Sequence, residues 1–142
     1  MAKRKTGALQ NPAVVTLDIV DLITGKLNEL EGIEFARDAW ENKAPDQYGV
    51  VTLSFEPIVQ YADGHLIDEI NRCTVDMYTE GSSDTWPALV REKLAELEDG
   101  NDWLDMSCRL TAREYLFDIN KVHWTMQINF AGPVIRTVSA GG

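Results

Sequence analysis

HWTMQINF, residues 123–130, is the stretch that decides the fold. Trp124, Met126, Ile128 and Phe130 occupy every second position, and polar side chains stand between them. A period of two is typical of a β-strand with one buried and one wet face. Antiparallel sheets commonly leave one face in water, so we expect this strand to belong to a mainly antiparallel sheet.

The same period recurs in the segments that precede this strand. Residues 106–117 alternate as well, with the apolar residues from Met106 to Ala112 on one face, and a turn at 118–121 connects the two strands. Earlier strands are expected at residues 33–37, 48–55, 58–61 and 66–78. Between the last two is Asp63-Gly64, a dipeptide that tolerates positive φ and suits a tight hairpin turn.

Two segments follow the helical period instead. Apolar side chains recur at three- and four-residue steps over residues 12–30, where Asn11-Pro12 is a start signal and Gly32 a left-handed stop. A second amphipathic helix is expected over residues 84–98, capped by the preceding stretch Gly81-Ser82-Ser83-Asp84.

These elements stand in the order α-β-β-β-α-β-β. Each amphipathic helix needs an apolar surface to cover, and long hairpins favour antiparallel pairing. The sequence therefore predicts an α+β fold, a mainly antiparallel sheet with two helices packed on one face and the other face exposed. We expect a basic N-terminal arm at residues 1–11, a single domain at residues 12–131 and a flexible C-terminal tail at residues 132–142.

Composition and charge limit the class of partner. A length of 142 residues suits one domain, and 44% hydrophobic with 25% charged residues is ordinary for a folded protein. The net charge is −10, and outside Lys3, Arg4 and Lys5 there are ten basic against twenty-three acidic side chains. This acidic body disfavours nucleic-acid wrapping, which depends on phosphate neutralisation. No stretch suits a signal peptide or a membrane span, so we expect a soluble protein made in the cytoplasm, with no membrane partner.

The residue types that carry catalysis are sparse. The chain has two histidines, His65 and His123, and two cysteines, Cys73 and Cys108, none of them in a nucleophile, metal-binding or redox motif. We expect the cysteines to be reduced core residues and His123 to lie on the polar side of its strand. Acidic clusters are expected to be solvated faces, with cation capture between subunits left open. The sequence therefore predicts no catalytic residue, no metal and no cofactor.

Two tryptophans stand outside the apolar stripes. Trp40 lies in the polar stretch 38–47, and Trp103 follows a turn. A large amphipathic ring in such a place either packs on its own domain or contacts a second chain, and the sequence leaves both open.

The order of elements resembles that of a family of viral assembly proteins. It is carried by LDIVDLITGKLNELEGIEFARDAWENKAPDQYGVVTLSF at residues 17–55 and SSDTWPALVREKLAEL at residues 82–97. Together with the length, these segments are similar to the small tail-terminator (tail-completion) proteins of long-tailed bacteriophages, over roughly residues 12–130. The basic arm and the glycine-ended tail depart from that pattern, and the family has no catalytic residues to carry over.

The resemblance implies a structural virion protein located at the tail and neck. Such a protein forms a homo-oligomeric ring, a hexamer, on the head-proximal end of the tail tube. Its partners are the tail tube protein and a neck or head-completion protein, and DNA only passes through the lumen. The alternatives are a head-side connector or minor capsid protein, a small binding module, and a small enzyme.

Loops, exposed strand edges and extended termini are suitable material for contacts between subunits. The expected interface is the loop around residues 38–47, the hairpin tip and both terminal arms. The predicted interface residues are Trp40, Glu41, Asn42, Lys43, Asp63, Gly64, Lys3, Arg4, Lys5 and Arg136.

Overall fold

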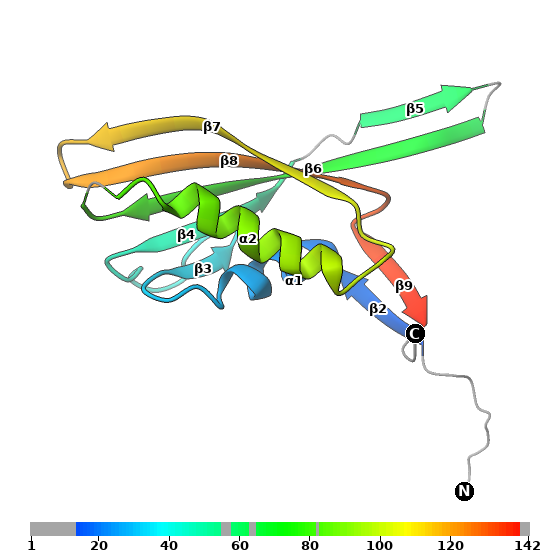
Figure 1. Cartoon of the computed structure of the whole chain (residues 1–142), viewed down its shortest axis with the longest axis horizontal. Coiled ribbons are helices and arrows are strands. Elements are labelled where there is room, and N and C mark those ends of the chain that lie inside the picture. Colours follow the sequence, from blue (N-terminus) through cyan, green and yellow to red (C-terminus); the bar gives the residue numbers. More distant parts are fainter. Residues whose placement is uncertain (1–13, 55–57, 63–64, 82, 140–142) are drawn as a thin grey trace, which may run out of the picture.

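The computed structural model describes residues 14–54, 58–62, 65–81 and 83–139 (Figure 1). In chain order its elements are β2 (Val14–Asp18), α1 (Ile19–Leu27), β3 (Glu34–Arg37), β4 (Tyr48–Leu53), β5 (Ile58–Ala62), β6 (His65–Thr79), α2 (Trp86–Asp99), β7 (Met106–Leu116), β8 (Lys121–Ala131) and β9 (Ile135–Ser139). The chain is an α+β fold, as predicted, and α1 and α2 lie on the same face of the main sheet (Figure 1). Within the described residues, no helix has the length and apolarity that crossing a membrane requires.

The main sheet has six strands in the order β3-β4-β6-β8-β7, and β5 pairs with the far end of β6. All of its pairs are antiparallel except β3–β4, which is parallel. The loop at residues 38–47 returns the chain to the end of the sheet where β3 began, and this return makes the pair parallel. The prediction of a mainly antiparallel sheet is therefore confirmed, with one parallel edge pair that the sequence analysis missed.

The core lies between the helices and one face of this sheet. Every second residue of β8, from Val122 to Phe130, is buried, as its alternation predicted. The helices contribute Ile19, Val20, Ile23, Leu27, Val90, Leu94 and Leu97 to the same cluster. Burial of these side chains is the main favourable term in folding, and it holds the helices on the sheet.

The first helix is shorter than predicted. Residues 14–18 form strand β2, and α1 begins at Ile19 because the Asp18 carboxylate accepts hydrogen bonds from the backbone N–H groups of Val20 (2.9 Å) and Asp21 (3.3 Å). This is the bonding of a helix N-cap, and a cap ends the extended chain before it. The expected start signal at Asn11-Pro12 lies outside the described residues.

The sequence predicted a flexible tail over residues 132–142, and this prediction is wrong for part of the segment. Its residues 135–139 form strand β9, which pairs antiparallel with β2 as a separate two-stranded sheet. We call this pair the ribbon. The sequence analysis missed β9 because its partner strand, β2, lies at the opposite end of the described chain, so no local pattern indicates the pairing.

Two local predictions are also corrected. Helix α2 begins at Trp86, and its N-cap, Thr85, makes no side-chain cap hydrogen bond; Asp84, expected in the cap, instead accepts a bond from Arg113 at 3.1 Å. In β7 the register shifts between Leu110 and Ala112. This β-bulge moves Ala112 off the apolar face and leaves it opposite Thr125.

Candidate assembly interface

The open face of the main sheet carries a polar cluster around His123. Its Nε2 atom lies 2.7 Å from Oδ1 of Asp76, and the Thr125 hydroxyl donates to the same carboxylate oxygen at 3.2 Å. In a nucleophile relay one ring nitrogen of the histidine meets the hydroxyl and the other meets the carboxylate. Here Nε2 meets both, and the hydroxyl points to the carboxylate, so the arrangement does not activate Thr125.

Aromatic rings run across this open face beside His123. The rings of Tyr48 and Tyr78 are stacked with centroids 4.8 Å apart, and those of Tyr78 and His123 with centroids 4.4 Å apart. Partial burial raises the pKa of the Tyr78 hydroxyl, and the charge of Asp76 raises it further. The chain therefore covers this end of the open face with its own side chains.

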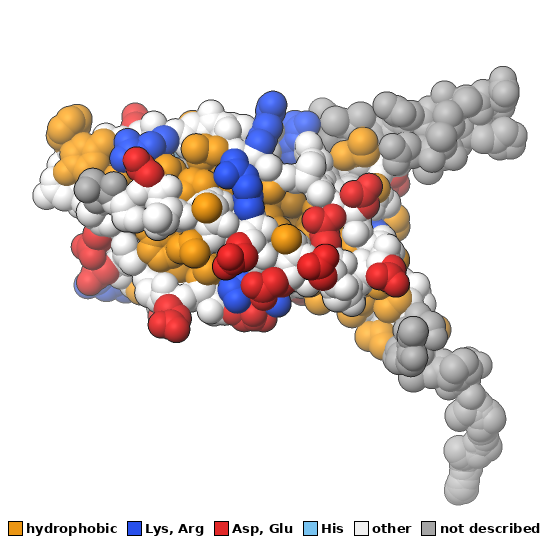
Figure 2. Space-filling view, in the orientation of Figure 1, with side chains coloured by type: hydrophobic (Ala, Val, Ile, Leu, Met, Phe, Trp, Pro, Cys, Tyr) orange, Lys and Arg blue, Asp and Glu red, His pale blue; other side chains and the backbone are white. Residues whose placement is uncertain are grey.

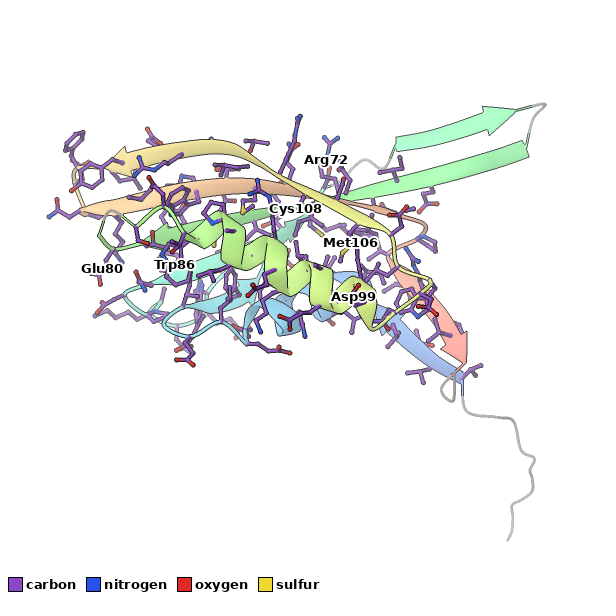
Figure 3. The ribbon with its side chains drawn as sticks, in the orientation of Figure 1. Arg72, Glu80, Trp86, Asp99, Met106 and Cys108 are labelled. Atoms are coloured by element: carbon purple, nitrogen blue, oxygen red, sulfur yellow. The ribbon has the colours of Figure 1, made fainter. Side chains whose placement is uncertain are left out.

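Neither thiol has the properties of a reactive cysteine. Burial raises the pKa of Cys73 to about 12 and that of Cys108 to about 11. Both residues pair with Ile128, from strands on either side of β8. At about 4.8 Å per strand spacing their Cα atoms are roughly 10 Å apart, too far for a disulfide. Cys108 and Met106 lie on β7 beside α2 (Figure 3), as expected of small apolar residues near the core.

Metal-binding groups are not gathered in the described part of the chain. No group of three or more His, Cys, Asp or Glu side chains there is placed to hold an ion. The acidic residues of α2 lie mostly on its exposed side; Glu98, half-buried, accepts a hydrogen bond from the Met106 backbone at 3.0 Å.

Both tryptophans left open by the sequence analysis pack on their own domain. The Trp40 ring is half-buried, meets Tyr48 edge to face, and its Nε1 donates to the Gly49 carbonyl at 3.2 Å. Trp103 is half-buried against the core, with the Arg136 guanidinium 5.2 Å from its ring centroid. Trp40 is thus held on its own domain by a ring contact and a hydrogen bond, and its role at an interface stays a prediction.

The other predicted interface residues divide into three groups. Glu41, Asn42 and Lys43 are exposed in the loop between β3 and β4. Lys3, Arg4, Lys5, Asp63 and Gly64 lie outside the described residues. The strands beside the predicted Asp63-Gly64 turn do pair antiparallel, with Ala62 opposite His65.

Arg136 forms the third group, and the structure commits it to its own chain. The guanidinium donates to the carbonyl oxygens of Trp103 and Pro133, each at 3.0 Å, and of Ala131. Three of its five N–H donors therefore link β9 to neighbouring backbone segments.

Exposed large apolar residues reveal two surfaces that the sequence analysis missed. Seven such residues occur in the described part of the chain, and six of them fall in two places. The tip patch, at the β7–β8 turn and the adjoining end of β7, consists of Tyr115, Phe117 and Ile119, whereas Leu110 lies in the middle of β7. The other three are on the ribbon, where Val14 and Ile135 lie on one face and Val15 on the other.

The two places lie at opposite ends of the molecule. Figure 2 shows apolar side chains at the β7–β8 turn, on the left, and near the ribbon, at the lower right. Phe117 is the most exposed of the set, at 81%. A signal in the sequence could have found the tip, because Phe117 and Ile119 flank Asp118 in a turn, where apolar side chains have no core to enter.

Two elements project from the helix-covered body. Strand β6 is 15 residues long, but β8 pairs with it only from Ile70 to Thr79. The N-terminal part of β6 pairs with β5 instead, and this hairpin extends past the helices at the upper right of Figure 1. The ribbon projects from the body at the lower right. Two-stranded elements are marginally stable alone, and exposed strand edges are ready to pair with other chains.

Comparison with the models of known protein families and with characterised protein sequences finds no match.

Proposed function

We propose that this protein is a ring-forming structural subunit, a tail terminator that caps the head-proximal end of a bacteriophage tail tube and joins it to the neck. The observation that carries the proposal is the position of the exposed apolar residues. Six of the seven in the described part of the chain lie at the β7–β8 turn or on the ribbon, at opposite ends of the subunit. Apolar surfaces at opposite ends suit head-to-tail contacts, and such contacts generate a closed ring when the rotation between subunits closes.

The projecting elements support an assembly role. The β5–β6 hairpin and the ribbon leave strand edges beyond the helix-covered body, and β7 has no strand on its outer side in the described chain. A contact with a neighbouring tube or neck protein would satisfy these edges, as strand addition does in other assemblies.

The charge of the chain is compatible with a channel through which DNA passes. The net charge of −10 repels phosphate, so a lumen lined by acidic residues would let DNA slide without binding it. Once the ring has been imaged, replacing acidic side chains at its lumen with lysine should slow DNA ejection. Unchanged ejection would remove this part of the proposal.

The proposal is tested with the purified chain and the tail tube protein of the same phage. We expect light scattering and electron microscopy to show a closed ring of this chain, and tube polymerisation to stop when the ring is added. A chain that stays monomeric both alone and with the tube protein contradicts the proposal. A ring that binds the head-side portal complex and ignores the tube would instead indicate a head-side connector.

A further inference from the structure

The ribbon is attached to the rest of the chain without using the core. None of its apolar side chains belongs to the buried cluster or packs against it; they are Val14, Val15, Leu17, Ile135 and Val138. In the described chain β2 and β9 pair only with each other, apart from the main sheet. A two-stranded sheet is marginally stable alone, and segments with few buried apolar contacts open at low free energy.

The base of the ribbon is fixed to α1. The Asp18 carboxylate caps that helix and accepts a hydrogen bond from Arg37 at 2.7 Å. Beside it, the Ile19 N–H donates to the Val134 carbonyl at 2.9 Å. These bonds lie where the ribbon meets the body, so they hold the base and do not reach the outer residues of the two strands.

Arg136 of β9 makes the other bonds to the body in the described chain. Its guanidinium donates to the carbonyls of Trp103 and Pro133, each at 3.0 Å, and of Ala131, and lies 5.2 Å from the centroid of the Trp103 ring. Gly132, at a φ of 90°, leaves room for it, because a Cβ there would lie 2.8 Å from Nη2. Since Trp103 packs against the core, Arg136 connects the ribbon to a fixed part of the body.

We propose that β2 and β9 separate as one unit while the main sheet stays folded, and that Arg136 is the latch that keeps them closed. They are the first and last described elements, so no other described strand has to move with them (Figure 1). Opening withdraws the guanidinium from the Trp103 ring and frees both strand edges for pairing. The device does not depend on ring formation, because all of its contacts lie within one chain.

Native-state hydrogen exchange of the full chain, measured by mass spectrometry, tests the proposal. The amides of residues 14–18 and 135–139 should be protected, but at least about 100-fold less than those of β8, because local opening requires less free energy than global unfolding. Arg136→Ala should speed exchange in the ribbon by at least about 10-fold, as expected when bonds from a charged donor to carbonyls are lost. Exchange in β8 should stay unchanged.

Two matched variants separate the latch from a general loss of charge. Arg136→Lys keeps the charge but loses the planar fork of donors, so its effect should be intermediate. Arg109→Ala removes an exposed arginine of β7 and should leave exchange in the ribbon unchanged. Circular dichroism verifies that each variant folds, and light scattering verifies that the compared samples have the same mass.

A second measurement leaves Arg136 in place. Thr16 and Thr137 are directly opposite each other in the ribbon, so Thr16→Cys with Thr137→Cys places two thiols for a disulfide across the strands. After oxidation, the ribbon amides should exchange at least about 10-fold more slowly than in the reduced form of the same variant.

Each part of the proposal has its own contrary result. Equal protection of the ribbon and β8 in the wild type overturns the separate opening, and so does fast exchange that the disulfide does not slow. If Arg136→Ala leaves exchange in the ribbon unchanged, or if the wild-type ribbon has no protection to lose, Arg136 is not a latch. If Arg136→Ala does not fold, Arg136→Lys decides this point.

Discussion

Strands β7 and β8 are neighbours of equal length with opposite surroundings. Each has 11 residues, and they pair along nearly their whole length. Along β8, buried and half-buried residues alternate without exception, whereas most of β7 is exposed. The difference arises from position, because β8 lies between two strands under the helices and β7 lies at the edge. An alternating pattern therefore tells which way a side chain points, and the place in the sheet decides how much covers it.

The largest expected effect comes from truncating β8. Trp124 is 1% exposed, and its indole N–H donates to the Thr79 hydroxyl at 2.9 Å. Trp124→Ala should lower the free energy of unfolding by about 3–5 kcal/mol, through lost burial and the cavity left behind. Phe117→Ser, just beyond β7, should change it by less than about 0.5 kcal/mol. Urea denaturation measures both, and similar losses for the two variants would break the comparison.

Alanine substitutions at two glycines, one in a crowded site and one in an open site, should change the stability by smaller amounts. A Cβ at Gly49 of β4 would overlap the buried Phe35 ring and lie 3.3 Å from the Asp76 carbonyl. Gly49→Ala should therefore destabilise the fold by about 1–3 kcal/mol. At Gly25 of α1 nothing lies within 4 Å, so Gly25→Ala should stabilise it by about 0.5–1 kcal/mol through helix propensity. Thermal or urea unfolding measures whether each variant is more or less stable than the wild type. A stabilised Gly49→Ala would show that β4 has room to adjust.

The junction between the ribbon and the covered body should show a pH dependence. Partial burial raises the pKa of Asp18, but the hydrogen bond from Arg37 (2.7 Å), those from backbone N–H groups and the Arg37 charge lower it overall, below 3.8. A lowered pKa in the folded state stabilises the fold above the unfolded value, and this contribution is lost as pH falls through the folded value.

The matched variant is Asp18→Asn, which retains a capping side chain and removes the charge. We expect it to cost about 1 kcal/mol at pH 7 and progressively less below pH 4, where the wild type also loses the charge. Urea midpoints between pH 2.5 and 7 follow this difference. A difference that stays constant down to pH 2.5 would mean that the Arg37 contact does not stabilise the fold.

The smallest effect is expected at the two thiols. Because burial raises both pKa values, only about a thousandth of Cys108 and less of Cys73 is thiolate at pH 8. A thiol-specific reagent should label the native chain at least about 100-fold more slowly than the urea-unfolded chain, as mass spectrometry would record. Rapid labelling of Cys108 alone would show that α2 opens away from the edge strand.

The sequence predicted the helix-covered half of the molecule better than its ends. The apolar alternation of β8 and the helical stripe of α2 are local, repeat several times and match the observed burial. Asp18 was read as part of a longer helix because Val14–Leu17 continue an apolar stripe, although their β-branched members also suit a strand. Arg136 was expected at an interface because it lies in the C-terminal segment, and its local sequence does not indicate the three backbone carbonyl oxygens to which it donates.

By itself the sequence determined the α+β class, the mainly antiparallel sheet and the face that each central strand buries, because these follow from the periods of neighbouring residues. Only the tertiary structure decided that β2 pairs with β9, that β3 runs parallel to β4, and that most exposed large apolar residues lie at the β7–β8 turn or on the ribbon, at opposite ends. Such features join residues far apart in the chain, and the free energy that selects them comes from backbone hydrogen bonds and burial, which a local pattern does not contain.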